Sequence, residues 1–465
     1  MTFPLLLAHA LVARQDLPIP DWLFAWGASL VLIISFTALS FLWREPRFED
    51  DDWRPLSERI GGLVVNPVTK GLAAFAGLFL FVLVIYSGLH GTDAPDRNFS
   101  LTFAFVTFWL GMVALSVLFG DVFRAFNPWR TIARGISEGF RLIAGQRAPA
   151  PLTYPDWLGR WPSVLGILAF AWLELIYGAS GLTVGLNPHV TGVAVIVYSG
   201  ITFAGMGLFG IDRWLERGEI FSVYMNMFSQ LAPLEVRNGK LGRRKSLSAA
   251  GHHWTDVPGS VGLVIATIGA TSFDGGQEGL FNSWINSWFR HIKDIGFDPT
   301  TAFRITESLI LVIVVAGIGA VFWLGVWGMQ SVDPDRSIGE LRRKFGHTLI
   351  PIAAAYLLAH YFSEFVFQEQ AQFTYLLSDP LGVGSNLFGT ANSGIDYTVI
   401  DAKTVWYVQV GALVVGHVIG LTMAHDRAIA LYKDPKEATR SQYWMLLVMI
   451  CFTTFGLFLL SQGNG

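Results

Sequence analysis

The sequence has few charged residues and almost no cysteine. Of its 465 residues, 14% are charged and only Cys451 is a cysteine, while 52% are hydrophobic. Because a soluble globular protein carries about 25% charged residues, this composition excludes a water-soluble enzyme and a disordered scaffold. A single cysteine excludes an internal disulfide, and its apolar surroundings give no information on the redox compartment.

The sequence also lacks an excess of positive charge and a familiar catalytic signature. The formal net charge of -3 offers nothing that would attract a nucleic acid. There is no HExxH, no Gly-x-Ser-x-Gly, no phosphate-binding loop and no CxxC. The sequence motifs that familiar soluble hydrolases and ATPases use for catalysis are therefore absent.

Long apolar runs without charged residues are abundant. Ten of them are close to the length of about 20 residues that a helix needs to cross a bilayer. We therefore expect an all-α protein that forms a single integral membrane domain over residues 1–465, with histidine-containing helices in residues 305–465. The predicted spans are 22–43, 71–89, 99–120, 161–182, 190–210, 257–273, 305–329, 347–366, 404–423 and 443–460.

The distribution of Lys and Arg predicts the orientation of these spans. Of the 32 Lys and Arg residues, 26 lie in the segments after the first, third, fifth, seventh and ninth spans. The positive-inside rule places these segments in the cytoplasm and both termini outside. The sixth run, 257–273, is short and contains Pro258, so a re-entrant hairpin is the alternative there. Without a sixth span, however, the charge asymmetry would be lost.

The N-terminal residues 1–12 are apolar but lack the positive n-region of a secretory signal. We expect an uncleaved segment that leads into the first span. The alternative is cleavage before His9, which would leave an N-terminal histidine able to bind copper through its amine and its ring.

Two stretches outside the spans have the pattern of interfacial helices. Residues 127–143 place Ile132, Ile136 and Phe140 at helical spacing, and residues 280–292 gather aromatic side chains on one side. We expect both stretches to lie along the membrane surface. Docking of a protein partner through them is the alternative.

A faint internal repeat links residues 71–145 to residues 161–234. Val-Ile-Tyr-Ser-Gly at 84–88 recurs as Leu-Ile-Tyr-Gly at 175–178, and Leu-Phe-Gly-Asp at 118–121 recurs as Leu-Phe-Gly-Ile-Asp at 208–212. Each copy is predicted to be a two-span hairpin followed by a surface helix. Parallel repeats occur in transporters, and chance similarity between apolar segments is the alternative.

Ionisable side chains inside the predicted spans are few. Each costs a few kcal/mol in hydrocarbon, so each is a functional candidate. Tyr356, His360 and Glu364 are four residues apart in the eighth span and therefore lie on one helix face, in its outer half. Glu307 begins the seventh span near the same side of the membrane.

Imidazoles and carboxylates together suit zinc, copper or iron, which predicts a divalent transition metal. The candidate metal ligands are His360, Glu364, His9 and Asp274. The candidate catalytic residues are Glu364, Glu307 and Tyr356. A proton relay and a structural contact between helices are the two alternatives for the same residues.

Three further side chains, Glu174, His347 and His417, form a candidate intramembrane polar or proton path. His347 and His360 also raise the question of haem. His360 follows His347 by 13 positions, which turns the helix by about 220° at 100° per residue, so the two rings face nearly opposite sides. Haem is therefore not expected.

Six segments carry a resemblance to a known family. They are Arg-Gln-Asp-Leu-Pro-Ile-Pro at 14–20, Asn-Pro-Trp-Arg at 127–130, Ser-Asp-Pro-Leu-Gly at 378–382, Trp-Tyr-Val-Gln-Val-Gly from 406 running to His417, Ala-His-Asp-Arg-Ala at 424–428 and Thr-Arg-Ser-Gln-Tyr-Trp at 439–444. Through them the chain resembles, over nearly its whole length, the actinobacterial fenitrothion hydrolase-like membrane proteins. The resemblance implies a bacterial cell membrane and hydrolysis of an organophosphorus ester. None of the segments matches a catalytic motif, so the resemblance assigns no residue a role.

Three functions follow as hypotheses. The first is a metal-dependent hydrolase, in which a metal-bound water at His360 and Glu364 attacks a phosphotriester that enters from the lipid. The second is a proton-coupled transporter or channel for an ion or small solute, which uses Glu174 and the His360 helix face. The third is an accessory subunit of a membrane complex. The lipid bilayer is the expected partner in each case, and no nucleic acid is expected.

Overall fold

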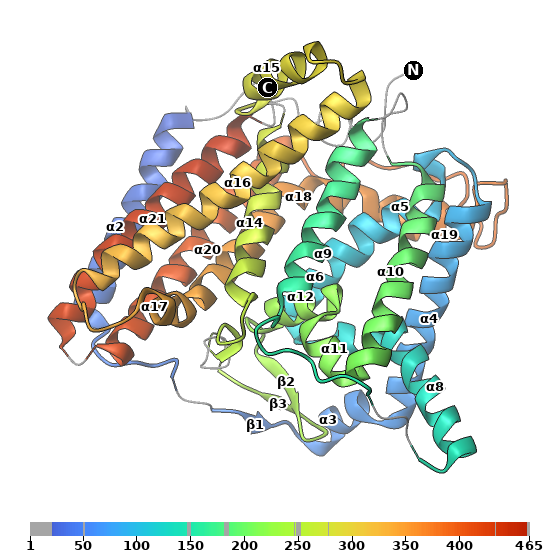
Figure 1. Ribbon diagram of the computed structural model, residues 1–465, viewed down its shortest axis with the longest axis horizontal. Coiled ribbons are helices and arrows are strands. Elements are labelled where there is room, and N and C mark those ends of the chain that lie inside the picture. The colour runs from blue at the N-terminus through green and yellow to red at the C-terminus, as the bar shows by residue number, and fades with distance from the viewer. Residues whose placement is uncertain are drawn as a thin grey trace.

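The computed structural model is a bundle of helices with one small sheet at one end (Figure 1). The structure describes residues 21–49, 52–146, 150–180, 186–245, 247, 253–277, 279–432 and 434–462. The predicted all-α class is confirmed, because the three strands of that sheet are two to four residues long.

Each of the ten predicted spans contains a helix. These helices are α2 (Asp21–Leu42), α4 (Pro67–His90), α5 (Phe99–Thr102) continued by η2 (Phe103–Gly111) and α6 (Met112–Phe119), α9 (Trp161–Trp172) continued by η3 (Leu173–Tyr177), α10 (Pro188–Phe209), α14 (Ser260–Gly276), α16 (Pro299–Gln330), α18 (Ile350–Phe373), α20 (Ala402–Leu431) and α21 (Pro435–Gln462). Both η2 and η3 are π-helical.

Among the described residues, seven helical stretches are long and apolar enough to cross a membrane. Residues 26–42 and 161–177 form shorter apolar helices, and α14 has 17 residues. The structure therefore supports a multi-pass membrane protein. The finer count of ten crossings stays a prediction.

The sixth predicted span, α14, is the centre of the bundle. It packs against α9, α16, α18 and α21, and 14 of its 17 residues are buried. Small residues allow this close packing: a Cβ atom added at Gly269 would lie 2.8 Å from the Cα atom of Val315 in α16. Because α14 is enclosed by protein, its short apolar length does not have to match the thickness of a bilayer.

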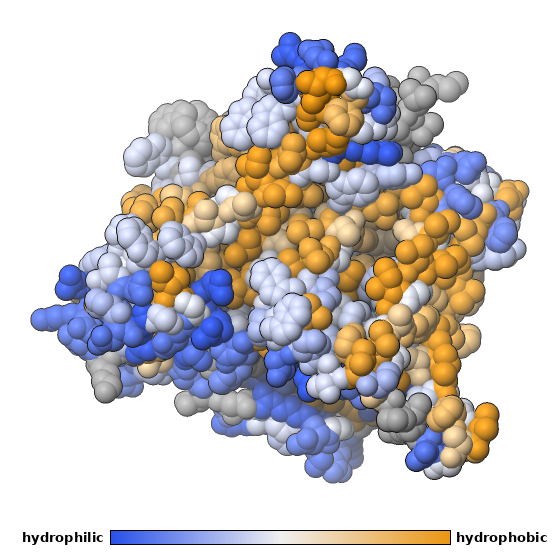
Figure 2. Space-filling view, in the orientation of Figure 1, coloured by the Kyte–Doolittle hydropathy of each residue, from blue (hydrophilic) through white to orange (hydrophobic). Residues whose placement is uncertain are grey.

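The two ends of the bundle differ in their short elements. One end, called the sheet side here, carries the three-stranded sheet and α17 (Ile338–Phe345), and the opposite end, called the α15 side, carries α15 (Asn282–Asp294) (Figure 1). Figure 2 shows hydrophilic residues gathered at the sheet side and around α15, with hydrophobic residues across the band between them. This arrangement is typical of a protein that crosses a bilayer.

The remaining short elements are α3 (Glu58–Val65), η1 (Pro95–Arg97), α7 (Phe123–Phe126), α8 (Pro128–Ala144), η4 (Gly178–Ser180), α11 (Ile211–Arg217), α12 (Ile220–Ser229), η5 (Gly346–Leu349) and α19 (Tyr375–Ser378).

The small sheet was not predicted. It consists of β1 (Arg54–Pro55), β2 (Leu234–Arg237) and β3 (Lys240–Arg243), in the order β1-β3-β2, with antiparallel pairing throughout. The hairpin between β2 and β3 turns at Asn238 and Gly239, whose φ angles of 50° and 76° are both positive. Asn-Gly is the strongest sequence signal for such a turn, so the hairpin was readable from the sequence.

The two predicted interfacial helices are present as α8 and α15. Asn127 caps α8 by accepting a hydrogen bond from the backbone nitrogen of Arg130. Apolar side chains of α8 are exposed, Ile143 at 91%, which suits a helix that lies at a lipid surface. In α15, Trp284 and Trp288 are exposed. Docking of a partner on these helices stays a prediction.

The two predicted repeat units have the same order of elements. In each unit, two long helices are followed by two shorter ones, α7 and α8 in the first and α11 and α12 in the second. In the second unit α11 has the exposed residues Asp212, Arg213 and Glu216, whereas α12 is buried, with Tyr224, Met225 and Met227 fully enclosed. The surface helix of the second unit is thus not contradicted. The duplication itself stays a prediction.

Candidate functional site

A buried carboxylate on α14 holds two side chains of α18. Asp274 Oδ2 accepts a hydrogen bond from the Tyr361 hydroxyl at 2.7 Å and lies 2.7 Å from His360 Nε2. The side chain of Asp274 is 9% exposed and that of His360 is 16% exposed. This arrangement ties the end of α14 to the middle of α18 through charged or strongly polar groups.

Asp274, one of the predicted ligands, lies against His360. The sequence also favoured a His360–Glu364 pair on one helix, and the bond that the structure places on His360 Nε2 goes to Asp274 of another helix. Residues four apart on a helix point in the same direction, so the helix packed against that face supplies the closest partner. Of the four candidate metal ligands, the structure thus brings His360 and Asp274 together.

Two further carboxyl groups lie close to Asp274. Glu174, in the π-helical turn η3, is near enough to Glu364 and Asp274 for their charges to repel one another. Glu174 Oε2 is buried and has no hydrogen-bond partner among the described residues. Like charges in a buried place disfavour the ionisation of all three carboxyl groups. These side chains, Glu174, Asp274, His360, Tyr361 and Glu364, are called the Asp274 cluster here.

A line of hydrogen-bonding aromatic side chains extends from the Asp274 cluster. The Tyr361 ring contacts the Trp109 ring of η2, with ring centroids 5.1 Å apart. Trp109 Nε1 donates to the Tyr224 hydroxyl of α12 at 3.2 Å. Sequence reasoning missed Tyr361, Trp109 and Tyr224, because aromatic residues are common in the spans and their contacts depend on how the helices pack.

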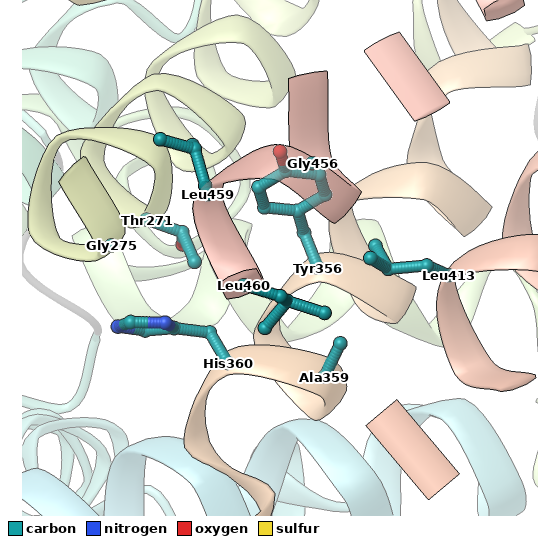
Figure 3. A pocket seen from close by; sticks show the side chains of 9 residues that line it. All are labelled: Thr271, Gly275, Tyr356, Ala359, His360, Leu413, Gly456, Leu459 and Leu460. Carbon is teal, nitrogen blue, oxygen red and sulfur yellow. The ribbon is translucent and has the colours of Figure 1, made fainter. Parts of the chain in front are cut away.

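A small pocket lies beside His360 (Figure 3). Its lining comes from α14, α18, α20 and α21, and consists of Thr271, Gly275, Tyr356, Ala359, His360, Leu413, Gly456, Leu459 and Leu460. Figure 3 shows Tyr356 and His360 reaching from successive turns of α18. The pocket leaves room for about one water molecule, so the described arrangement does not admit an aryl phosphotriester.

Tyr356, one of the candidate catalytic residues, is buried against α21. Its hydroxyl has no hydrogen-bond partner of good geometry among the described residues. A Cβ atom added at Gly456 would lie 2.6 Å from that hydroxyl, so glycine is required for the close approach. Tyr356 therefore borders the pocket rather than the Asp274 carboxylate.

The remaining predicted residues make other contacts. Glu307 is 2% exposed in α16 and accepts a hydrogen bond from Gln277 Nε2 at 3.3 Å. His347 is buried in η5, beyond the other end of α18. His417 is fully buried in α20, where its Nδ1 lies 2.8 Å from the Leu413 carbonyl oxygen and its Nε2 has no partner among the described residues.

The described residues do not complete a metal site. Within them, no group of three or more His, Cys, Asp or Glu side chains comes together in a way that could hold a metal ion. The carboxylate oxygen Asp274 Oδ2 is already engaged by two side chains. His9, the other candidate ligand, lies outside the described residues. The divalent metal stays a prediction.

A second buried carboxylate, that of Glu219 at the start of α12, was missed. It accepts hydrogen bonds from the backbone nitrogens of Phe221 at 3.1 Å and Ser222 at 2.7 Å, from Asn127 Nδ2 at 3.2 Å and from the Tyr198 hydroxyl. Burial raises the pKa of the Glu219 carboxyl, and the hydrogen bonds from Ser222 and Tyr198 offset part of that rise. Glu219 was overlooked because it lies in a segment rich in Arg and Lys that was interpreted as cytoplasmic.

A third buried carboxylate, that of Glu369, lies three residues beyond the predicted end of the eighth span. It was therefore not counted among the intramembrane groups. Observed α18 continues to Phe373, so Glu369 lies within the helix. The end of the apolar run marked the wrong boundary, because polar side chains that face protein do not end a buried helix.

Comparison of the chain with models of protein families, with curated proteins and with solved structures found no match in any of the three.

Proposed function

We propose that this chain is a ten-span protein of a bacterial cell membrane that carries protons through the Asp274 cluster. The observation that carries the proposal is the bond of Asp274 Oδ2 to both His360 and Tyr361, beside Glu174 and Glu364. The helical state of all ten apolar segments and the excess of Lys and Arg on the sheet side favour a cytoplasmic sheet side and outside termini.

The chemistry of the Asp274 cluster suits proton transfer. A histidine ring takes up a proton on one nitrogen and releases one from the other, and a carboxylate at 2.7 Å is within direct transfer distance of His360. The Tyr361 hydroxyl also donates a hydrogen bond to Asp274 Oδ2, and this second bond keeps the carboxylate oriented toward His360. Glu364 and Glu174 offer the next carboxyl positions along the same site. An ionisable set of this kind inside a helix bundle is typical of proton-coupled transport of an ion or small solute.

The proposal is tested by proton flux into vesicles. The purified protein is reconstituted into liposomes that contain a pH-sensitive dye, and a potassium diffusion potential is applied with valinomycin. Wild-type protein is expected to acidify the lumen faster than empty vesicles, and Asp274→Asn is expected to lower that rate by about tenfold or more. Asp294→Asn, at an exposed position of α15, is the control and should match wild type. A wild-type rate equal to that of empty vesicles contradicts the proposal.

Hydrolysis of an organophosphorus ester is the second candidate function. The His360–Asp274 pair favours it, because an imidazole held by a carboxylate can act as a general base toward a water in the adjoining pocket, while the ester itself would have to bind outside that pocket. Elemental analysis of protein purified without chelator, together with a phosphotriester assay, tests this function. Hydrolysis that His360→Ala abolishes would support it, and hydrolysis that survives in His360→Ala and Glu364→Ala would contradict it.

A further inference from the structure

The environment of Glu369 is unusual for a buried acid. Both of its carboxylate oxygens are shielded from water, and no hydrogen bond of good geometry reaches them from the described residues, where the Thr107 hydroxyl is the side-chain donor that acts on them. No Lys, Arg or His in the part of the chain that the structure describes lies near enough to compensate its charge. A buried carboxylate without a counter-charge is costly, and either a proton or a bound cation balances it.

Two more unpartnered oxygens lie beside Glu369. Thr107 of η2 faces the Glu369 carboxyl, and its Oγ1 makes no hydrogen bond of good geometry to the described residues. Gln372, one turn further along α18, is 3% exposed, and its Oε1 is also unpartnered. Residues 369 and 372 lie on one helix face. This Glu369 site thus has two carboxylate oxygens, an amide oxygen and a hydroxyl, and none of these oxygens makes a hydrogen bond of good geometry to the described residues.

The π-helical geometry of η2 explains why the Thr107 hydroxyl is available. Several buried threonines elsewhere in the bundle donate to the carbonyl oxygen four residues earlier, as Thr306 does to Ala302 at 2.8 Å and Thr453 does to Met449 at 2.7 Å, although Thr191 of α10 makes no such bond. Thr107 lies in the middle of η2, where the wider turns shift the carbonyls away from this position. Its hydroxyl is therefore directed to the neighbouring helix, as expected of a π-helical turn at a functional site.

The helices α18 and η2 pack together along this face. A Cβ atom added at Gly111 of η2 would lie 3.5 Å from the Phe365 ring of α18, and Thr107 meets Glu369 one turn further along both helices. The oxygens are therefore held between two packed helices rather than on a mobile loop. Such a fixed arrangement is what selects a cation by size.

We infer that Glu369, Thr107 and Gln372 form a binding site for a monovalent alkali-metal cation. Ligands that are all oxygens suit hard cations and not soft transition metals. The single negative charge of Glu369 matches one positive charge. This inference concerns different residues from the Asp274 cluster and does not rest on proton transport.

Sodium binding is tested by the unfolding temperature of the purified protein in mild detergent. Choline chloride is replaced by sodium chloride or potassium chloride at constant ionic strength. Wild type is expected to show a saturable rise in the unfolding temperature with one of the two alkali cations. Glu369→Gln should weaken the apparent affinity by about tenfold or more, and Thr107→Val should weaken it by a smaller factor.

The matched controls are Glu437→Gln, which removes an exposed carboxylate, and Thr306→Val, which removes a hydroxyl that is bonded within its own helix. Both should keep the wild-type response to the cation. The inference is overturned if choline stabilises wild type as well as the alkali cations do, if only calcium or magnesium stabilises it, or if the full response persists in Glu369→Gln. Since wild type alone decides the first two outcomes, poor folding of a variant does not leave the question open.

Discussion

Glu219 and Glu369 are both buried carboxylates in this chain, and their surroundings are opposite. Glu219 accepts hydrogen bonds from four groups, two of them backbone nitrogens at the start of α12. The oxygens of Glu369 accept no hydrogen bond of good geometry from the described residues. The protein therefore supplies the donors that offset the cost of burying the Glu219 carboxylate. It supplies no donor of good geometry to Glu369.

The difference separates a structural carboxylate from a functional one. Glu219 caps α12 and, through Asn127, joins it to the cap of α8, so its bonds connect two helices. The oxygens of Glu369 make no hydrogen bond of good geometry that would connect two helices, and we infer that they bind a cation. The Asp274 cluster is intermediate, because Asp274 is bonded to two side chains while Glu174 Oε2 has no partner in the described structure.

The largest effect on stability is expected at Glu219. Glu219→Ala removes the acceptor of four hydrogen bonds and leaves buried donors unsatisfied, which should cost about 3 kcal/mol of unfolding free energy. The measurement is an unfolding titration with a denaturing detergent in mixed micelles. Glu216→Ala, at an exposed residue that pairs with Arg217, is the control and should change the free energy by less than about 1 kcal/mol. Equal losses in the two variants would show that Glu219 is not a structural carboxylate.

A smaller effect is expected at Tyr361. Tyr361→Phe removes one of the two partners of Asp274 Oδ2 and keeps the ring contact with Trp109, so about 1 kcal/mol should be lost. The same unfolding titration measures it, with Tyr407→Phe at an exposed position as the control. If the proton-flux assay shows a slower rate in Tyr361→Phe while stability hardly changes, orientation of Asp274 is the main role of this hydroxyl.

A weaker and pH-dependent effect is expected at Asp379 on the α15 side. Burial alone would raise the pKa of this carboxyl, but hydrogen bonds from Ser385, Gly384 and Val383 outweigh it and hold the pKa below its usual range. A carboxyl with a lowered pKa in the folded state adds stability above the unfolded pKa, and this stability is lost as the pH falls through the folded value. Because Asp379 is near the surface, Asp379→Asn should cost a few tenths of a kcal/mol at pH 7 and almost nothing in strong acid. Unfolding temperatures at several pH values, with Asp335→Asn as the control, measure the effect, and a loss that persists in strong acid would contradict this assignment.

The smallest effect is expected at Glu369 when alkali cations are absent. Glu369→Gln removes a buried carboxylate that no hydrogen bond of good geometry holds among the described residues, so the unfolding free energy in choline chloride should not fall by more than about 0.5 kcal/mol. A loss as large as that of Glu219→Ala would mean that Glu369 has structural partners, and the contrast between the two carboxylates would fail.

The positions of helices were predictable from the sequence to a large extent, and the partners of the site residues were not. Apolar runs located all ten helical segments, and the spacing of Tyr356, His360 and Glu364 correctly placed them on one face of α18. The same spacing suggested Glu364 as a partner of His360, and only the structure shows that His360 Nε2 is bonded to Asp274 of another helix. A one-helix pattern gives the direction of a side chain but not the residue that a packed helix brings to it.

Composition and charge distribution by themselves determined that this chain is an all-α membrane protein, because a bilayer demands long apolar helices and topology follows Lys and Arg. The tertiary structure alone decided that α14 is the enclosed centre of the bundle and that Asp274 joins His360 and Tyr361. It also decided that η2 is π-helical and turns Thr107 toward Glu369. The physical reason is that contacts between helices depend on packing and register, which a repeating apolar pattern leaves open.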